Sequence, residues 1–205
     1  MRGLLLKDML NLRKSIWFIL AIVAIWGVCG ESFSIFAVFY FSYAVISSTA
    51  SADENCGWNK LETSLPFTRR ELVEERYVLG AISLGIGAVC IAIVRLAAAA
   101  FRGGAETLSG IIPIHYCGTS IGFLLNAILL PLQMKYGYTK SRVVALFVYG
   151  AITVICFTFV SFVSNKGIAF AVQTEIFLPA MLIVFAFLDY LSFLVSVKIY
   201  EKREF

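Results

Sequence analysis

The chain has 205 residues, of which 60% are hydrophobic, and its mean hydropathy is +0.87. This composition lies far outside the range of soluble globular proteins. Seventeen Lys and Arg residues and thirteen Asp and Glu residues give a net charge of +4, but the basic residues flank apolar runs, so the charge does not indicate nucleic-acid binding. The apolar runs are long and continuous, which favours an all-α membrane protein over a spanning barrel.

The chain begins with a basic amphipathic segment, residues 1–14. On a helix, Leu5, Met9 and Leu12 share one face, whereas Lys7 lies on another. Such a helix is typical of the membrane interface, where basic side chains meet anionic headgroups. The alternative is a plain extension of the first span.

Six apolar runs follow, and about 20 such residues cross a bilayer core. They are Ser15–Gly30, Phe33–Ala50, Tyr77–Phe101, Leu108–Met134, Val143–Ser164 and Ile176–Val197. The first two are separated by two residues and should form a tight hairpin. The mildly apolar segment 165–175 fits a half-inserted helix or a longer start of the sixth helix equally well. We expect one membrane domain over residues 1–205.

Orientation follows from the basic residues, which favour the cytoplasmic side. With the N-terminus inside, the inner side holds fourteen of them: Arg2, Lys7, Arg13, Lys14, Lys60, Arg69, Arg70, Arg76, Lys135, Lys140, Arg142, Lys198, Lys202 and Arg203. The outer side holds Arg102 and Lys166. We therefore expect a multi-pass protein of the cell membrane with both termini in the cytoplasm.

One long polar stretch, residues 51–76, separates the second span from the third. Its charged residues are Asp53, Glu54, Glu62, Glu71, Glu74, Glu75, Lys60, Arg69, Arg70 and Arg76. Ser51 with Glu54, and Thr68 with Glu71, have the spacing of capping boxes, in which a hydroxyl accepts from a first-turn amide and the Glu reaches back. Two helix starts are therefore predicted.

The first of these helices is expected at Ala52–Thr63. Trp58, Leu61 and Leu65 follow one another at helical spacing on one side, and Leu65 ends the helix because a proline follows it. The second helix should start after Thr68 and continue into the third span. We interpret the first as a docking helix on the membrane surface with an exposed Trp58. A solvated loop whose Trp enters the headgroups is the alternative.

Ionisable groups inside a bilayer are costly, so they are candidates for function. Arg95 is expected toward the outer side and Asp189 toward the inner side, and a direct pair is not expected. Arg95 could snorkel outward or meet Glu175. Asp189 could face a water-filled interior or an inner-leaflet partner. A purely structural role in packing would explain either residue equally well. His115 is the only histidine, so a structural role and no metal site are expected.

Several short motifs together resemble a known family. They are GLLLKD at residues 3–8, the six spans, Asp53-Glu54, Gly57-Trp58, Leu65-Pro66, Arg69-Arg70-Glu71-Leu72-Val73 and Arg76-Tyr77. This pattern covers essentially the whole chain and is similar to the permease subunits of ABC-2 type exporters, in particular those that export phenol-soluble modulins from Gram-positive bacteria. Where similar proteins often have Lys-Tyr, this chain has Arg76-Tyr77, which keeps the charge.

The resemblance implies a permease without catalytic residues, which pairs with a second copy as a homodimer and binds two copies of a separate ABC ATPase. ATP and Mg²⁺ would belong to that ATPase, and no cofactor is expected in this chain, which also lacks a Walker A motif. The loop 51–76 would supply a coupling helix. Its ATPase-coupling residues would be Asp53, Glu54, Trp58, Leu61, Leu65, Arg69 and Arg70.

The same resemblance implies that the cargo is an amphipathic or antimicrobial-type peptide, moved out of the cell or the membrane. Membrane lipid is a further expected partner. The alternative from another class is a membrane scaffold or sensor subunit that transports nothing. A different permease could also replace one copy of the dimer.

Overall fold

The computed structural model describes residues 2–13, 15–61, 68–102, 108–165 and 174–202, and the structural statements below refer to these residues. They form eight helices and no strand: α1 (Arg2–Leu12), α2 (Ile16–Cys29), α3 (Glu31–Asn55), α4 (Trp58–Leu61), α5 (Arg69–Arg102), α6 (Leu108–Tyr136), α7 (Tyr138–Asn165) and α8 (Thr174–Glu201). The predicted all-α class is confirmed.

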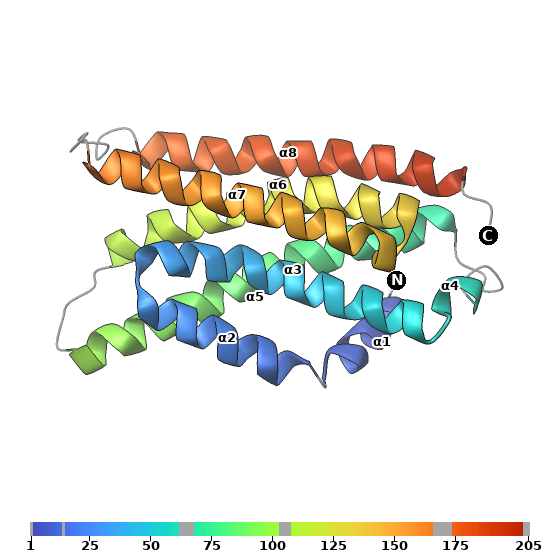
Figure 1. The fold of residues 1–205 in the computed structure, drawn as a ribbon, viewed down its shortest axis with the longest axis horizontal. Coiled ribbons are helices and arrows are strands. Elements are labelled where there is room, and N and C mark those ends of the chain that lie inside the picture. Colours follow the sequence, from blue (N-terminus) through green and yellow to red (C-terminus); the bar gives the residue numbers. More distant parts are fainter. Residues whose placement is uncertain (1, 14, 62–67, 103–107, 166–173, 203–205) are drawn as a thin grey trace.

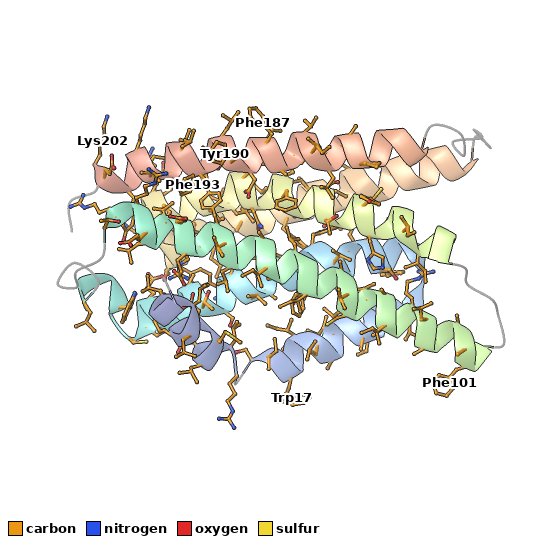
Figure 2. All side chains as sticks on the ribbon, turned by 180° about the vertical axis from the view of Figure 1, so that it is seen from behind. Trp17, Phe101, Phe187, Tyr190, Phe193 and Lys202 are labelled. Carbon is orange, nitrogen blue, oxygen red and sulfur yellow. The ribbon has the colours of Figure 1, made fainter. Side chains whose placement is uncertain are left out.

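The long helices run side by side in one bundle (Figure 1). The start of α1, the short α4 and the end of α8 lie toward one end of this bundle, which we call the terminal end. The turn between α2 and α3 lies at the opposite end. Aromatic side chains such as Trp17 and Phe101 project from the bundle (Figure 2), as expected for surfaces that face lipid.

Five helices, namely α3, α5, α6, α7 and α8, are each long and apolar enough to cross a membrane. The α1–α2 pair makes a sixth span if it counts as one, although the two helices are bent by 69° relative to each other. By itself α2 has 14 residues, or about 21 Å at about 1.5 Å per residue. These helices define a multi-pass membrane protein, and α3, α5, α6, α7 and α8 agree with the second to sixth predicted spans.

The tight hairpin predicted between the first two spans is confirmed. Its turn is Gly30, with φ at 142°, a conformation that glycine adopts far more readily than other residues. Ser34 N donates to Gly30 O at 3.0 Å, so Glu31 and Ser32 already belong to α3.

The helix start predicted at Ser51 is wrong. α3 continues to Asn55 because no residue interrupts its hydrogen-bond ladder, and Cys56 N still donates to Ala52 O at 3.0 Å. Gly57, with φ at 68°, then ends the run, and α4 has four residues. The helix expected at Ala52–Thr63 is therefore split between α3 and α4.

The helix start predicted at Thr68 is confirmed. Thr68 N and Thr68 Oγ1 each donate to Glu71 Oε2 at 2.9 Å, and Glu71 N donates to Thr68 Oγ1 at 3.3 Å. From there α5 runs for 34 residues, about 51 Å at about 1.5 Å per residue. A bilayer core is about 30 Å thick, so the charged first two turns, Arg69–Arg76, extend beyond the apolar part of the helix.

The small residues of α6 pack inside the chain. A Cβ on Gly118 would lie 2.9 Å from Val38 Cβ of α3, and one on Gly122 would lie 2.1 Å from Leu84 Cδ2 of α5. These glycines therefore let three helices of one chain approach closely, as small residues do in membranes.

We expect Gly118→Ala to lower the free energy of unfolding by about 1–3 kcal/mol, since the added methyl group overpacks α6 against α3. Gly85→Ala is the matched control, because a Cβ there meets nothing within 4 Å, and better helix propensity should make it neutral or stabilising by up to about 1 kcal/mol. Thermal unfolding in one detergent measures both variants, and equal melting temperatures would contradict this account of the packing.

Candidate functional site

Five charged side chains meet inside the terminal end of the bundle. Lys7 and Asp8 come from α1, Asp53 from α3, and Glu75 and Arg76 from α5. We call these five residues the ion network. None of its three carboxylates is more than 2% exposed, so the charges are compensated mainly by one another.

Asp53 is at the centre of the ion network. Lys7 Nζ donates to both of its carboxylate oxygens at 2.9 Å, and Arg76 Nη2 donates to its Oδ2 atom. Arg76 Nη1 also donates to Thr49 Oγ1 at 3.2 Å. Lys7 Nζ lies 4.3 Å from the centre of the Trp58 ring, which adds a cation–π contact with α4. The network therefore connects α1, α3, α4 and α5.

The acids Asp8 and Glu75 form the second half of the network. Both oxygens of Asp8 and Oε1 of Glu75 are buried without a hydrogen-bond donor among the described residues, although Lys7 Nζ lies 3.1 Å from Asp8 Oδ1. A proton held between the two carboxyl groups would satisfy them. Burial, together with the neighbouring Asp8 carboxyl group, raises the pKa of Glu75 to about 8. With Glu75 protonated, two cations face two carboxylates and the network is neutral.

Helical spacing explains why these charges point inward. Leu4, Asp8 and Leu12 follow one another at i, i+4 and i+8, and all three are buried. Glu75 likewise lies between the buried Leu72 and Leu79 on α5. An acid inside an apolar stripe is a pattern that could have revealed both residues, although neither Asp8 nor Glu75 was predicted to have a role.

A second apolar face of α1 is exposed. Leu6, Met9 and Leu10 are exposed, a surface that suits the membrane interface expected for this helix. Of the predicted face, Leu5, Met9 and Leu12, only Met9 is exposed, because Leu12 is buried and Leu5 packs against the core. The helix predicted over residues 1–14 is confirmed for Arg2–Leu12. Its buried face, however, carries the ion network.

Two further predicted residues bind the ends of other helices. Glu54 Oε2 accepts from Thr139 N at 2.8 Å, at the start of α7, where a carboxylate also suits the helix dipole. Arg69 Nη1 donates to the carbonyls of Tyr200 and Glu201 at the end of α8, at 3.3 and 2.5 Å. The segments flanking α4 thus contact α7 and α8 as well.

The remaining predicted coupling residues differ in exposure. Trp58 is half-buried and packs against a core cluster that includes Leu4, Tyr77 and Leu130, so the expectation of an exposed Trp is wrong. Leu61 is 56% exposed, and Arg70 is exposed. Leu65 lies outside the described residues.

A cavity of about 60 Å³ adjoins the ion network. Its lining includes Asp53, Glu75 and Arg76 of the network, together with Gln133 near the end of α6 and Tyr138 at the start of α7. This volume has room for water, so the network has a polar space into which its side chains could rearrange.

The candidates inside the membrane lie in separate places. Arg95 is 4% exposed, and its Nη1 atom donates to Ser34 Oγ at 3.1 Å, beside the end of α2, so it does not snorkel outward. His115 lies within electrostatic range of the Arg95 guanidinium group. Both ring nitrogens of His115 are buried without a hydrogen-bond partner among the described residues. The side chain of Glu175 is not among those described.

Asp189 is buried near Tyr77 in the terminal half of the bundle. Tyr77 is 18 residues from Arg95 along α5, about 27 Å at about 1.5 Å per residue. The expectation that Asp189 and Arg95 do not pair is therefore confirmed. No group of three or more His, Cys, Asp and Glu side chains among the described residues could hold a metal ion.

The long apolar helices, with charged groups concentrated at one end, define a helical multi-pass membrane protein. A family model described as "ABC-2 family transporter protein" matches residues 3–201. The chain belongs to this family and is therefore the membrane component of an ABC transporter. Comparisons with curated proteins and with solved structures gave no match.

We expect Asp53→Asn to lower the free energy of unfolding by about 3–5 kcal/mol, since Lys7 and Arg76 lose the carboxylate that pairs them. Asp8→Asn should cost less than about 1 kcal/mol, because its amide can donate to Glu75 in place of the shared proton. Thermal unfolding of the two variants in one detergent measures the difference. A larger loss for Asp8→Asn would contradict the shared proton.

The raised pKa of Glu75 predicts a pH dependence of stability. The folded protein keeps a proton on Glu75 up to about pH 8, whereas the unfolded chain releases it near 4.5. The contribution of this proton to the free energy of unfolding is therefore complete below about pH 4.5 and is lost as the pH rises through about 8. Glu75→Gln should reduce this fall in melting temperature, and a variant with the wild-type pH profile would contradict the assignment.

Proposed function

We propose that the chain is the membrane-spanning subunit of an exporter driven by a separate ABC ATPase, and that the terminal end is cytoplasmic and binds that ATPase. Membership of the ABC-2 transporter family supports a transport role with an ABC ATPase partner in general. The positive-inside rule supports the cytoplasmic assignment. ATP and Mg²⁺ are then bound by the ATPase.

One observation carries the proposed coupling. The last turn of α3 and the first residue of α5, on either side of α4, are bonded through side chains to α1 at Lys7, to α7 at Thr139 and to the end of α8. A force on α4 would therefore reach the four long helices α3, α5, α7 and α8, and also α1, through contacts that are short and largely charged. In this proposal α4 is the coupling helix.

Exposure separates the residues that meet the ATPase from those that transmit its movement. Leu61 and Arg70 are exposed and are the proposed contact residues. Asp53 and Trp58 are covered by α1 and the core, so they transmit displacement to α1 and α5. Glu54 and Arg69 are exposed as well, but their side chains bond the start of α7 and the end of α8, so we assign them to the transmission of movement to those two helices.

The proposed assembly has two permease copies and two ATPase copies, as the family resemblance implies. The exposed face of α7 supports a homodimer, because it is apolar and contains Gly150, where a Cβ would meet nothing within 4 Å. Small residues on such a face allow a second helix to approach. The proposed cargo is an amphipathic peptide, and the exposed apolar stripe of α1 is one lipid-level surface that such a peptide could contact.

We expect Leu61→Asp to reduce co-purification of the ATPase at least about tenfold, because a charge replaces an apolar contact at the docking surface. Leu61 contributes little to the fold, so membrane insertion and the melting temperature of the permease alone should be unchanged. Affinity purification from native membranes, with quantitative mass spectrometry, measures the ATPase recovered.

Lys140→Gln is the control for this experiment. It changes the net charge by the same single unit at an exposed residue of α7 near the terminal end, and it should leave ATPase recovery unchanged. Full ATPase recovery with Leu61→Asp would reject α4 as the docking element. Absence of any ATPase from the intact wild-type oligomer would instead favour a scaffold or sensor subunit.

A further inference from the structure

A groove of about 320 Å³ runs between α5 and α8 in the terminal half of the bundle. Tyr77 and Val78 line it from α5, and Asp189, Tyr190 and Phe193 line it from α8. We call it the α5–α8 groove. Figure 2 shows Phe187 pointing away from the bundle, whereas Phe193 lies on the side of α8 toward α5, where its ring contacts that of Tyr77.

Helical spacing creates this groove. On α5, Tyr77 and Ala81 lie one turn apart, and on α8 Ala186 lies one turn before Tyr190. Because both helices carry alanine at these positions, the space between them is not filled by side chains. Arg70 and Glu74 line the end of the groove nearest the start of α5.

Asp189 places a buried carboxyl group in the groove. It is 8% exposed, and its Oδ1 atom is buried without a hydrogen-bond partner among the described residues. A carboxylate in an apolar environment is unfavourable unless a cation or a donor accompanies it. Within the groove the charges are Asp189, Glu74 and Arg70, so the ionised set carries one net negative charge.

Aromatic rings surround the same space. The centre of the Phe193 ring lies 5.5 Å from that of Tyr77 and 6.3 Å from that of Tyr190. A carboxylate combined with aromatic rings is the arrangement that binds an ammonium group, through an ion pair and cation–π contacts. Apolar walls complete a site for a molecule with both a cationic and an apolar part.

We propose that the α5–α8 groove is a binding site for cationic amphipathic peptides, in which Asp189 binds a lysine ammonium group and Tyr77, Tyr190 and Phe193 contact its apolar stem. This inference rests on the proposed peptide cargo. It further specifies that the cargo is cationic and names the side chains that recognise it.

The depth of Asp189 favours a peptide over an amine-bearing lipid. Asp189 lies 12 residues before Glu201, the end of α8, which is about 18 Å along the helix. A lipid ammonium group stays at headgroup level beside its phosphate, whereas a peptide that enters the groove can place a lysine at Asp189 with the apolar lysine stem lying against the aromatic rings. The groove, open along its side, admits such a stem from the inner leaflet.

The test uses the full chain in phosphatidylcholine nanodiscs and a fluorescent, photo-reactive amphipathic peptide of leucine and lysine. We expect saturable binding, with cross-links to α5 and α8 at the groove. Asp189→Asn should weaken binding at least about tenfold, whereas Asp189→Glu should retain most of it. A peptide with glutamate in place of lysine should not bind.

Glu201→Gln is the matched control, since it makes the same acid-to-amide change at the exposed end of α8 and should bind as the wild type does. Equal binding by wild type and Asp189→Asn, or cross-links elsewhere, would overturn the groove assignment while leaving the peptide cargo intact. Loss of cross-linking when phosphatidylethanolamine replaces phosphatidylcholine would assign the groove to lipid. A wild-type protein that binds neither peptide would overturn both the cargo and the groove.

Discussion

The terminal end of the bundle depends on keeping buried charges neutral. Lys7 and Arg76 both bond Asp53, and Asp8 and Glu75 complete the ion network beneath them. Removing any one helix would leave charges unpaired in an apolar interior, which is strongly unfavourable. This explains why the face of α1 that lies against α3 and α5 carries Lys7 and Asp8 beside the buried Leu4 and Leu12, while Leu6 and Leu10 stay exposed.

The rest of the bundle is held by different forces along its length. In the middle, glycines of α6 allow close contact with α3 and α5. At the opposite end, Arg95 bonds Ser34, which itself donates to Gly30 O at 2.8 Å, so a buried cation lies beside the carbonyl end of α2. A cation is favourable at the end of a helix dipole. The helices are thus joined by polar contacts at both ends and by packing between them.

α5 connects the proposed coupling site with the proposed peptide groove. Glu75 and Arg76 belong to the ion network, and the next residue, Tyr77, faces the groove and bonds Ser192 and Ser196 of α8 at 2.9 and 2.8 Å. A small rotation or shift of α5 would therefore change both places together. Rigid helices with two packed arrangements are the kind of element through which distant sites are coupled.

Local sequence patterns determined the spans, the α2–α3 hairpin and the start of α5, because hydrophobic run length, glycine and a Thr-x-x-Glu box act within a few residues. The equally plausible box at Ser51 failed, since a helix already under way continues until Gly57 ends it. Only the tertiary structure decided the roles of Asp53 and Asp8. Lys7 and Asp53 are 46 residues apart, and no local pattern records which distant charge will neutralise a buried one.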